Sequence, residues 1–160
     1  MEQTKLKALE LNAAKARLYG VQMVHDAASG HPGGSMSCMD VLTYLYFAEM
    51  HVDPKNPHDP DRDRFVMSKG HCSPAMYPVL ALRGFFPVED LKMFRRIDGH
   101  MSGHVEMKYV PGVDMSTGSL ARASPLPSAW RWPARSRART TASIRSWATA
   151  KLPRVRSGKP

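Results

Sequence analysis

The chain has 160 residues, of which 42% are apolar, so it is long enough for one modest domain or for part of a larger one. The mean hydropathy is −0.39, there is no long apolar run, and the N-terminal segment is charged throughout, so we expect neither a membrane span nor a signal peptide. The two cysteines, Cys38 and Cys72, do not have the spacing of a disulfide framework or a metal finger, which favours a reducing, cytoplasmic setting.

The net charge of +9 is confined to one end of the chain. Residues 1–120 hold 13 Lys and Arg against 14 Asp and Glu, whereas residues 121–160 hold 10 Lys and Arg and no acidic residue. All 7 histidines, 11 methionines, 5 tyrosines and 5 phenylalanines lie before position 121, and all 3 tryptophans lie after it. The abrupt change predicts two segments of different origin, with a boundary at residue 120.

The first predicted element is a long helix over residues 2–28. Leu6, Leu9, Ala13, Ala16 and Gly20 recur every three or four residues, and Val21 and Val24 continue this apolar face. The glycines and the proline of residues 29–37 should then end the helix.

The next segments predict a helix, a loop and a strand in that order. Residues 38–50 are apolar on most sides, which favours a buried helix, and residues 51–63 form a polar, proline-rich loop. The short apolar run at 64–68 is typical of a buried parallel strand.

Two further helices are predicted before a glycine-rich loop. Ser73 and Pro74 give an N-cap and first-turn signal for a helix that runs to about Leu82 and is stopped by Gly84. Residues 88–97 form a second, amphipathic helix with acidic residues in its first turn and arginines in its last. Long helices around one short strand predict an incomplete α/β layered domain.

Residues that could bind a ligand or take part in catalysis are concentrated in loops that place histidine beside glycine. Three such segments are SGHPGG with His31, SKGH with His71, and GH with His104, and a fourth loop, STGSL, spans 116–120. Glycine allows backbone amides to approach an anion such as phosphate, and histidine can bind it or move a proton near neutral pH. Ordinary structural roles remain open: His31 could cap the next helix and His71 could bond a buried carbonyl. Cys72 beside His71 has no evident Asp or Asn partner that would favour a thiol nucleophile.

The combination of SGHPGGSMS, DRFVMSKGH and GH followed by PGVDMSTGSL, in this order and spacing, resembles the N-terminal part of transketolases, which are thiamine diphosphate enzymes. The resemblance covers residues 1–120 and extends to the N-terminal subunit of split bacterial transketolases. It implies an incomplete doubly wound thiamine diphosphate-binding domain. A relative such as deoxyxylulose phosphate synthase is an alternative, although the SKGH and GH segments favour transketolase.

The resemblance implies roles for individual residues. His31 would contact the sugar and assist proton transfer, and His104 would contact the donor ketose near its carbonyl. His71 would lie beside the cofactor diphosphate, and Gly118, Ser119 and Leu120 would pass the thiamine ring and diphosphate. The intact enzyme would transfer a two-carbon ketol unit between sugar phosphates, with thiamine diphosphate and a divalent metal (Mg²⁺ or Ca²⁺). It would require a C-terminal half or subunit, which carries the glutamate that activates the thiamine ring, and would form a homo-oligomer.

The resemblance stops at residue 120. The family continues with Gly-Gln-Gly and later Gly-Asp-Gly-Glu, which supplies a metal ligand, but residues 121–160 contain no Asp or Glu. A GC-rich coding of Ile-Leu-Gly-Asp-Gly-Glu, ATC CTG GGC GAC GGC GAA, yields Ser-Trp-Ala-Thr-Ala and the start of Lys when the first base is skipped, which matches residues 146–151. The same shift reproduces 121–125, 128–133 and 152–159. The sequence therefore predicts an out-of-frame tail after Leu120, and an isolated chain without activity.

A competing hypothesis treats the tail as a basic nucleic-acid-binding arm. Lys and Arg among Ser and Pro can bind phosphates, and Trp130, Trp132 and Trp147 could stack on bases. The frame arithmetic disfavours this hypothesis because it also explains the missing acidic residues. On either hypothesis, residues 121–160 lack a regular apolar period, and we expect them to be disordered.

Overall fold

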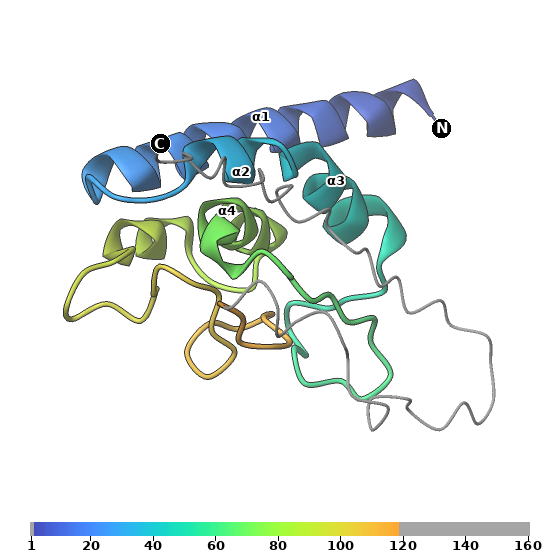
Figure 1. Ribbon diagram of the computed structural model, residues 1–160. Helices are drawn as coiled ribbons and strands as arrows, with labels where there is room; N and C mark the ends of the chain where they lie inside the picture. The colour runs from blue at the N-terminus through green and yellow to red at the C-terminus, as the bar shows by residue number, and fades with distance from the viewer. Residues whose placement is uncertain (1, 119–160) are drawn as a thin grey trace, which may run out of the picture.

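The computed structural model describes residues 2–118, which contain all the predicted helices. Ser119, Leu120 and the predicted disordered tail at 121–160 lie outside the described residues. The first helix, α1, spans Gln3–Asp26, which confirms the helix predicted at 2–28 apart from its ends. It lies along one side of the molecule, with the other helices beneath it and the long loops on the far side (Figure 1).

The buried face of α1 consists mostly of small residues. Ala13, Ala16, Gly20 and Met23 are buried against the neighbouring helices. Gly20 is needed here, because a β-carbon at this position would lie 2.6 Å from the carbonyl oxygen of Pro74. That carbonyl can approach α1 because Pro78, four residues further along its helix, has no amide hydrogen to bond it.

The predicted apolar face of α1 is wrong at two positions. Leu6 is 46% exposed and Val21 is 51% exposed, whereas the prediction placed both on the face that packs. The reason is geometric: the helices beneath α1 bury only a narrow face of it, formed by Ala13, Ala16, Gly20 and Met23, and these two residues lie outside that face.

Residues 29–37, which the sequence predicted to end the first helix and to form a loop, do follow the end of α1, but they are not loop throughout. A short helix, α2, spans Pro32–Met36, with proline at its first position, where its missing amide hydrogen does not matter. Next, α3 spans Met39–Tyr44 and continues as a π-helical turn over Leu45–Glu49. The predicted helix at 38–50 is confirmed in extent, but it is buried along one side only.

The strand predicted at 64–68 is not formed among residues 2–118. Phe65 and Met67 are buried and alternate with more exposed neighbours, as in a strand, but no second strand lies beside them. Side chains take the place of a strand partner. The Phe65 amide donates to Asp114 Oδ2 at 2.7 Å, and the Met67 carbonyl accepts from Thr117 Oγ1 at 2.7 Å.

The central helix, α4, spans Ser73–Arg83 and follows a 3₁₀ turn at Gly70–Cys72. It ends at Gly84, whose φ of +101° confirms the predicted glycine stop. Ser73 is not the N-cap as predicted: Cys72 occupies that position, and the Ser73 hydroxyl donates to the Gly103 carbonyl instead.

The helix predicted at 88–97 is a 3₁₀ helix over Val88–Met93. It stops before the arginines of its predicted last turn because Arg95 has a positive φ of 57° and its amide donates to the Met101 carbonyl. The polar loop predicted at 51–63 is confirmed, and 98–118 is likewise without helix.

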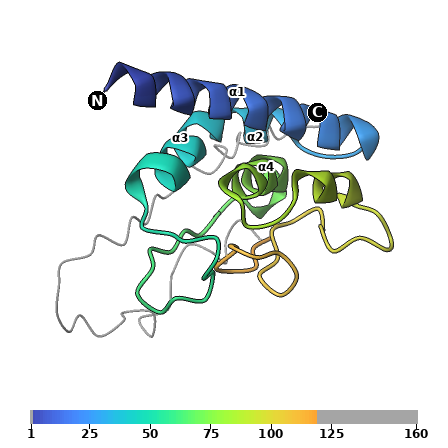
Figure 2. The same cartoon turned by 180° about the vertical axis from the view of Figure 1, so that it is seen from behind.

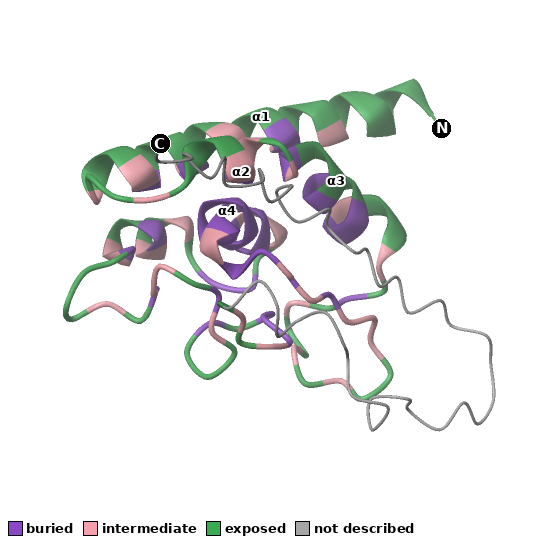
Figure 3. Ribbon diagram, in the orientation of Figure 1, coloured by how far each residue is buried: buried purple, intermediate pink, exposed green. Residues whose placement is uncertain are grey.

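The core lies around α4, whose residues 73–81 are all buried (Figure 3). The view from behind shows the same arrangement, with α1 on one side of α4 and the loops on the other (Figure 2). The largest fully buried side chains are Tyr46, Tyr77, Phe94, Met39, Leu42, Met67, Met76, Leu80 and Met101. None of the described helices is long and apolar enough to cross a membrane.

Residues 2–118 are mostly helical, so the strand part of the predicted α/β class is not seen within them. The only strand-like pairing within these residues is an isolated bridge between Phe94 and Met101.

Candidate active site

The structure brings together the three histidines that the sequence singled out. The rings of His31 and His71 meet edge to face, with centroids 4.8 Å apart. His104 lies beside Gly118, where a β-carbon would lie 3.7 Å from His104 Cδ2. His31 and His104 are exposed and His71 is half-buried, so all three rings are open to a ligand.

His31 reaches the site because the chain turns sharply before α2. Gly30 has φ +152°, and the His31 carbonyl accepts both the amide and the hydroxyl of Ser35. The His31 side chain makes no capping hydrogen bond to α2, although it occupies the N-cap position. The capping explanation is therefore wrong, and the ring remains available for other contacts.

His71 stands on the 3₁₀ turn before α4, and its surroundings favour the neutral ring. Burial lowers the pKa of His71, and the charges of His31, His104 and Lys69 lower it further. The ring makes no hydrogen bond to another described residue, so the structure does not show it bonding a buried carbonyl. A neutral imidazole presents one donor and one acceptor nitrogen to a ligand.

Lys69 holds the His31 and His71 segments together, a role that the sequence analysis did not assign. It is 6% exposed, and its Nζ donates to the Gly34 carbonyl at 2.7 Å and to Ser37 Oγ at 3.1 Å. These contacts fasten α2 to the residues before His71. The SKGH motif contained the signal, because a lysine inside a small-residue loop needs partners if it is buried.

The loop that carries His104 is held by α4. Tyr77 Oη donates to the carbonyls of Ser102 and His104, at 3.1 and 2.9 Å, and Ser73 Oγ donates to the Gly103 carbonyl at 2.8 Å. Ser73 and Tyr77 are four residues apart and therefore lie on one face of the helix. Burial raises the pKa of Tyr77 to about 12, so its hydroxyl keeps the proton that it donates.

Backbone contacts join the turn at 116–118 to the same region. The Thr117 amide donates to the Val105 carbonyl at 3.1 Å, and the Val105 amide donates to the Gly70 carbonyl at 3.2 Å. Gly70 must be glycine for this packing, because a β-carbon there would collide with the Thr117 carbonyl oxygen. Gly118 is thereby placed at the site, while Ser119 and Leu120 lie outside the described residues.

Cys72 does not have the properties of a thiol nucleophile. It is fully buried, and burial raises its pKa above the ordinary thiol value, which disfavours the reactive thiolate. Among residues 2–118, no contact is shown between the other histidines and His31, His71 or His104. A cavity of about 260 Å³ lies elsewhere, between α1 and the 3₁₀ helix Val88–Met93, and none of the three histidines lines it.

The arrangement suits binding and proton transfer at an oxygen-rich ligand. Three imidazoles can donate to, or accept from, hydroxyl and carbonyl groups, and the small residues beside them leave room for a bulky anion. Within residues 2–118, no group of three or more His, Cys, Asp or Glu side chains could hold a metal ion.

Comparison with known proteins gives a consistent result. Residues 9–125 match the family model described as transketolase, thiamine diphosphate binding domain. The match begins within α1 and runs five residues past the predicted boundary at 120.

Two curated relatives are themselves transketolase subunits. The chain is 43% identical over 116 residues to a subunit of the apulose-4-phosphate transketolase of Phocaeicola vulgatus, covering 72% of this chain and 41% of that protein. It is 50% identical over 93 residues to the 6-deoxy-6-sulfo-D-fructose transketolase subunit SqwG of a Clostridium species, covering 58% of this chain and 34% of the relative. The chain thus spans less than half the length of these relatives.

Solved structures of transketolases share the fold. The transketolase from Leishmania mexicana superposes with a TM-score of 0.64 at 36% identity, covering 69% of this chain and 17% of that one. A transketolase from Pichia stipitis, solved with sedoheptulose 7-phosphate, gives a TM-score of 0.63 at 37% identity, covering 69% of this chain and 16% of that one. The histidine-bearing loops, the family match and the shared fold agree: this chain belongs to the transketolase family, in its N-terminal thiamine diphosphate-binding domain.

Proposed function

We propose that this chain is the cofactor-binding N-terminal part of a transketolase that, when complete, transfers a two-carbon ketol unit from a ketose phosphate to an aldose phosphate. One observation carries the proposal: His31, His71 and His104, from three separate segments of the chain, lie close together, with Gly118 beside His104. Convergence of this kind is what a site for a phosphorylated, hydroxyl-rich ligand requires.

The residues present fit thiamine diphosphate. His71 would contact the diphosphate, and Gly118, with Ser119 and Leu120 beyond it, would lie along the thiamine ring and diphosphate. The space beside the His104 ring supports this fit, because Gly118 has no side chain to fill it. When bound, thiamine diphosphate supplies the stabilised carbon nucleophile of the reaction.

His31 and His104 would act on the sugar. Both rings are exposed at the site, so each can hydrogen-bond a substrate hydroxyl or carbonyl and transfer a proton there. His71 has a lowered pKa, so it would be neutral before the ligand binds and could donate from one ring nitrogen. Held by Lys69 and Tyr77, the loops would keep these rings in a fixed relation to each other.

The complete activity would require groups that this chain does not contain. In the family, an acidic loop that follows the segment corresponding to residues 116–120 holds a divalent metal, Mg²⁺ or Ca²⁺. Residues 121–160 of this chain have no acidic residue. The glutamate that activates the thiamine ring would come from a C-terminal half or subunit. We therefore propose that the 160-residue chain is inactive alone and that the intact form works with a partner and as a homo-oligomer.

We also propose that the reading frame is lost after Leu120. The absence of acidic residues after position 120 and the sudden appearance of tryptophan there support a single-base shift. The nucleotide sequence across codons 118–123 tests it. We expect one inserted base to restore a Gly-Asp-Gly-Glu loop downstream, whereas a gene in which no single-base correction restores it would contradict the proposal.

Affinity measurements test the cofactor assignment. We expect the full chain to bind thiamine diphosphate more tightly than thiamine, because only the former carries the diphosphate that His71 would contact. The His71→Asn variant should weaken binding of thiamine diphosphate by about tenfold, the loss of one charge-assisted hydrogen bond. His58→Asn, in the exposed loop at 51–63, is the matched control and should not change affinity. Equal affinity for the two ligands would contradict the assignment.

The products of turnover distinguish a transketolase from the alternative, a deoxyxylulose phosphate synthase. A frame-corrected chain, supplied with a C-terminal transketolase subunit, should convert a ketose phosphate and an aldose phosphate into two new sugar phosphates. Formation of deoxyxylulose phosphate instead would identify the alternative activity. The two named relatives described above are transketolase subunits, which supports the first outcome.

A further inference from the structure

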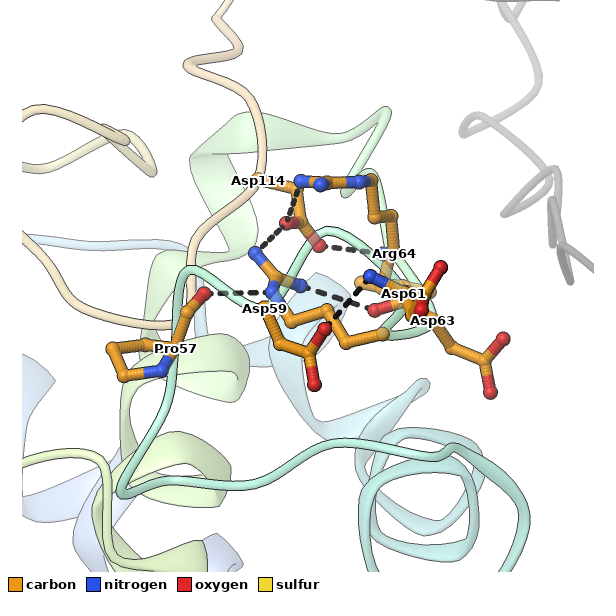
Figure 4. Close-up of polar contacts among 8 residues, drawn as sticks. Pro57, Asp59, Asp61, Asp63, Arg64 and Asp114 are labelled. Carbon is orange, nitrogen blue, oxygen red and sulfur yellow. Dashed lines mark hydrogen bonds and ion pairs between the residues drawn. The ribbon is translucent and has the colours of Figure 1, made fainter. Parts of the chain in front are cut away.

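Asp114 is a fully buried carboxylate at the start of the turn that leads to Gly118. Its side chain is completely inaccessible, and it pairs with the Arg62 guanidinium, which is 7% exposed. Arg64 lies 3.7 Å from the same carboxylate oxygen, Oδ1, while the other oxygen, Oδ2, accepts the Phe65 amide at 2.7 Å. Both carboxylate oxygens therefore face donors from one short segment, residues 62–65 (Figure 4).

Arg62 is itself fixed by three acceptors. Its Nε donates to the Pro57 carbonyl at 2.7 Å, its Nη1 donates to the Asp63 carbonyl at 3.0 Å, and its Nη2 donates to Asp114 (Figure 4). A guanidinium presents its donors in a rigid plane, so these three bonds fix the direction from which it meets Asp114. The loop at 57–63 thus orients Arg62 so that its guanidinium binds the Asp114 carboxylate.

Asp114 and Thr117 together attach the turn to the extended segment before His71. Asp114 holds the Phe65 amide, and three residues later Thr117 Oγ1 holds the Met67 carbonyl. From Met67 the chain continues to Gly70, whose α-carbon packs against the Thr117 carbonyl. Thr117 and Gly118 therefore sit where they do relative to His71 because Asp114 anchors one end of this two-point attachment.

We propose that Asp114, oriented by Arg62, is a positioning residue that sets the place of the Thr117–Gly118 turn beside His71 and His104. The functional consequence rests on the proposed function, in which this turn lies along thiamine diphosphate. The attachment requires a carboxylate because each of its two oxygens accepts from a different donor, Arg62 or the Phe65 amide. An asparagine would direct its amide group either at Arg62 or at the Phe65 amide and could satisfy only one side.

The first arm of the test is amide hydrogen exchange in the full chain, without cofactor. The amide to follow is that of Thr117, which bonds Val105 and does not touch Asp114. In Asp114→Asn, we expect Thr117 exchange to accelerate about tenfold or more beyond the change seen in the α1 and α4 amides. The matched control is Asp40→Asn, which removes the exposed partner of Arg17 by the same chemical change and should leave Thr117 exchange as it is.

A purely structural role for Asp114 gives a different pattern. Thr117 exchange would then rise only in step with the core amides of α1 and α4, and this result would overturn the proposal. If Asp114→Asn does not fold, Arg62→Lys is measured instead. It keeps the positive charge but cannot bond three acceptors at once, and the same selective acceleration at Thr117 is expected. Uniform acceleration in this variant would likewise overturn the proposal.

The second arm measures thiamine diphosphate affinity under conditions in which circular dichroism shows each variant to be folded. Asp114→Asn should weaken affinity by about tenfold, while Asp40→Asn should leave it unchanged. Unchanged affinity in folded Asp114→Asn would overturn the functional consequence. If the unaltered chain does not bind thiamine diphosphate, the proposed function fails, and the exchange arm still decides whether Asp114 positions the turn.

Discussion

At the scale of single residues, the candidate site depends on hydrogen bonds made by residues outside the motifs. The glycine-histidine segments were enough to predict His31, His71 and His104, because their chemistry is local to each motif. Tyr77 could not be predicted, since it holds the Ser102 and His104 carbonyls from 25 and 27 residues away along the chain. Asp114 was missed for the same reason, its partners lying 49 and 52 residues earlier.

The lowered pKa of His71 predicts an acid-sensitive fold. Its folded pKa lies below the value of about 6.5 expected in an unfolded chain, so the unfolded chain takes up the proton first as the pH falls. The contribution to stability is complete above pH 6.5 and is lost as the pH drops below it. Urea unfolding from pH 7.5 to 5.0 should show a smaller acid loss in His71→Gln than in the unaltered chain. An equal loss in both would contradict this.

Removing the Tyr77 hydroxyl should loosen the loop that carries His104. Tyr77→Phe leaves the Ser102 carbonyl without this donor and removes one of two hydroxyl donors to the His104 carbonyl, so we expect stability to fall by about 1–2 kcal/mol. Denaturant unfolding gives the energy, and hydrogen exchange of the Val105 amide reports on the loop. A variant with unchanged stability and unchanged exchange would show that α4 does not hold the loop.

At the scale of elements, helix positions were predictable and the local helix type was not. The periodicity of α1 and the glycine stop of α4 are properties of short sequence windows, and both predictions are confirmed in outline. The 3₁₀ form of Val88–Met93 depends on a tertiary contact, because the Arg95 amide bonds Met101 instead of continuing the helix. The strand predicted at 64–68 has the expected alternation, but its polar backbone groups bond side chains from the 114–117 segment.

The crossing of α1 and α4 depends on Gly20. Gly20→Ala would place a β-carbon 2.6 Å from the Pro74 carbonyl oxygen, which is backbone and cannot move aside cheaply. We expect a loss of about 1–3 kcal/mol in unfolding free energy, despite the better helix propensity of alanine. The control is Gly33→Ala, since nothing lies within 4 Å of its β-carbon position. Equal effects of the two substitutions would show that the helices do not meet at this point.

At the scale of the whole molecule, a layer of helices supports a layer of loops that carries the candidate site (Figure 1). The two layers are joined through α4, which packs against α1 on one side and binds the His104 loop on the other. The sequence could not predict this division, because it arises from contacts such as Ser73 to Gly103, 30 residues apart.

This arrangement predicts that the helices and loops unfold together. Gly20→Ala alters the helical layer and Tyr77→Phe alters the contact with the loops, so both should lower one shared unfolding midpoint. Circular dichroism, which follows the helices, and exchange of the Val105 amide, which follows the loops, should report coincident transitions. Two separate transitions would contradict this coupling.

The pKa of His71, followed by nuclear magnetic resonance of its ring with and without thiamine diphosphate, tests most directly whether the three histidines form a cofactor site. A diphosphate beside the ring stabilises the protonated form, so the pKa of His71 should rise from its lowered value when thiamine diphosphate is added, and should not rise with thiamine. A His71 pKa that is the same with and without saturating thiamine diphosphate would contradict this assignment of the site.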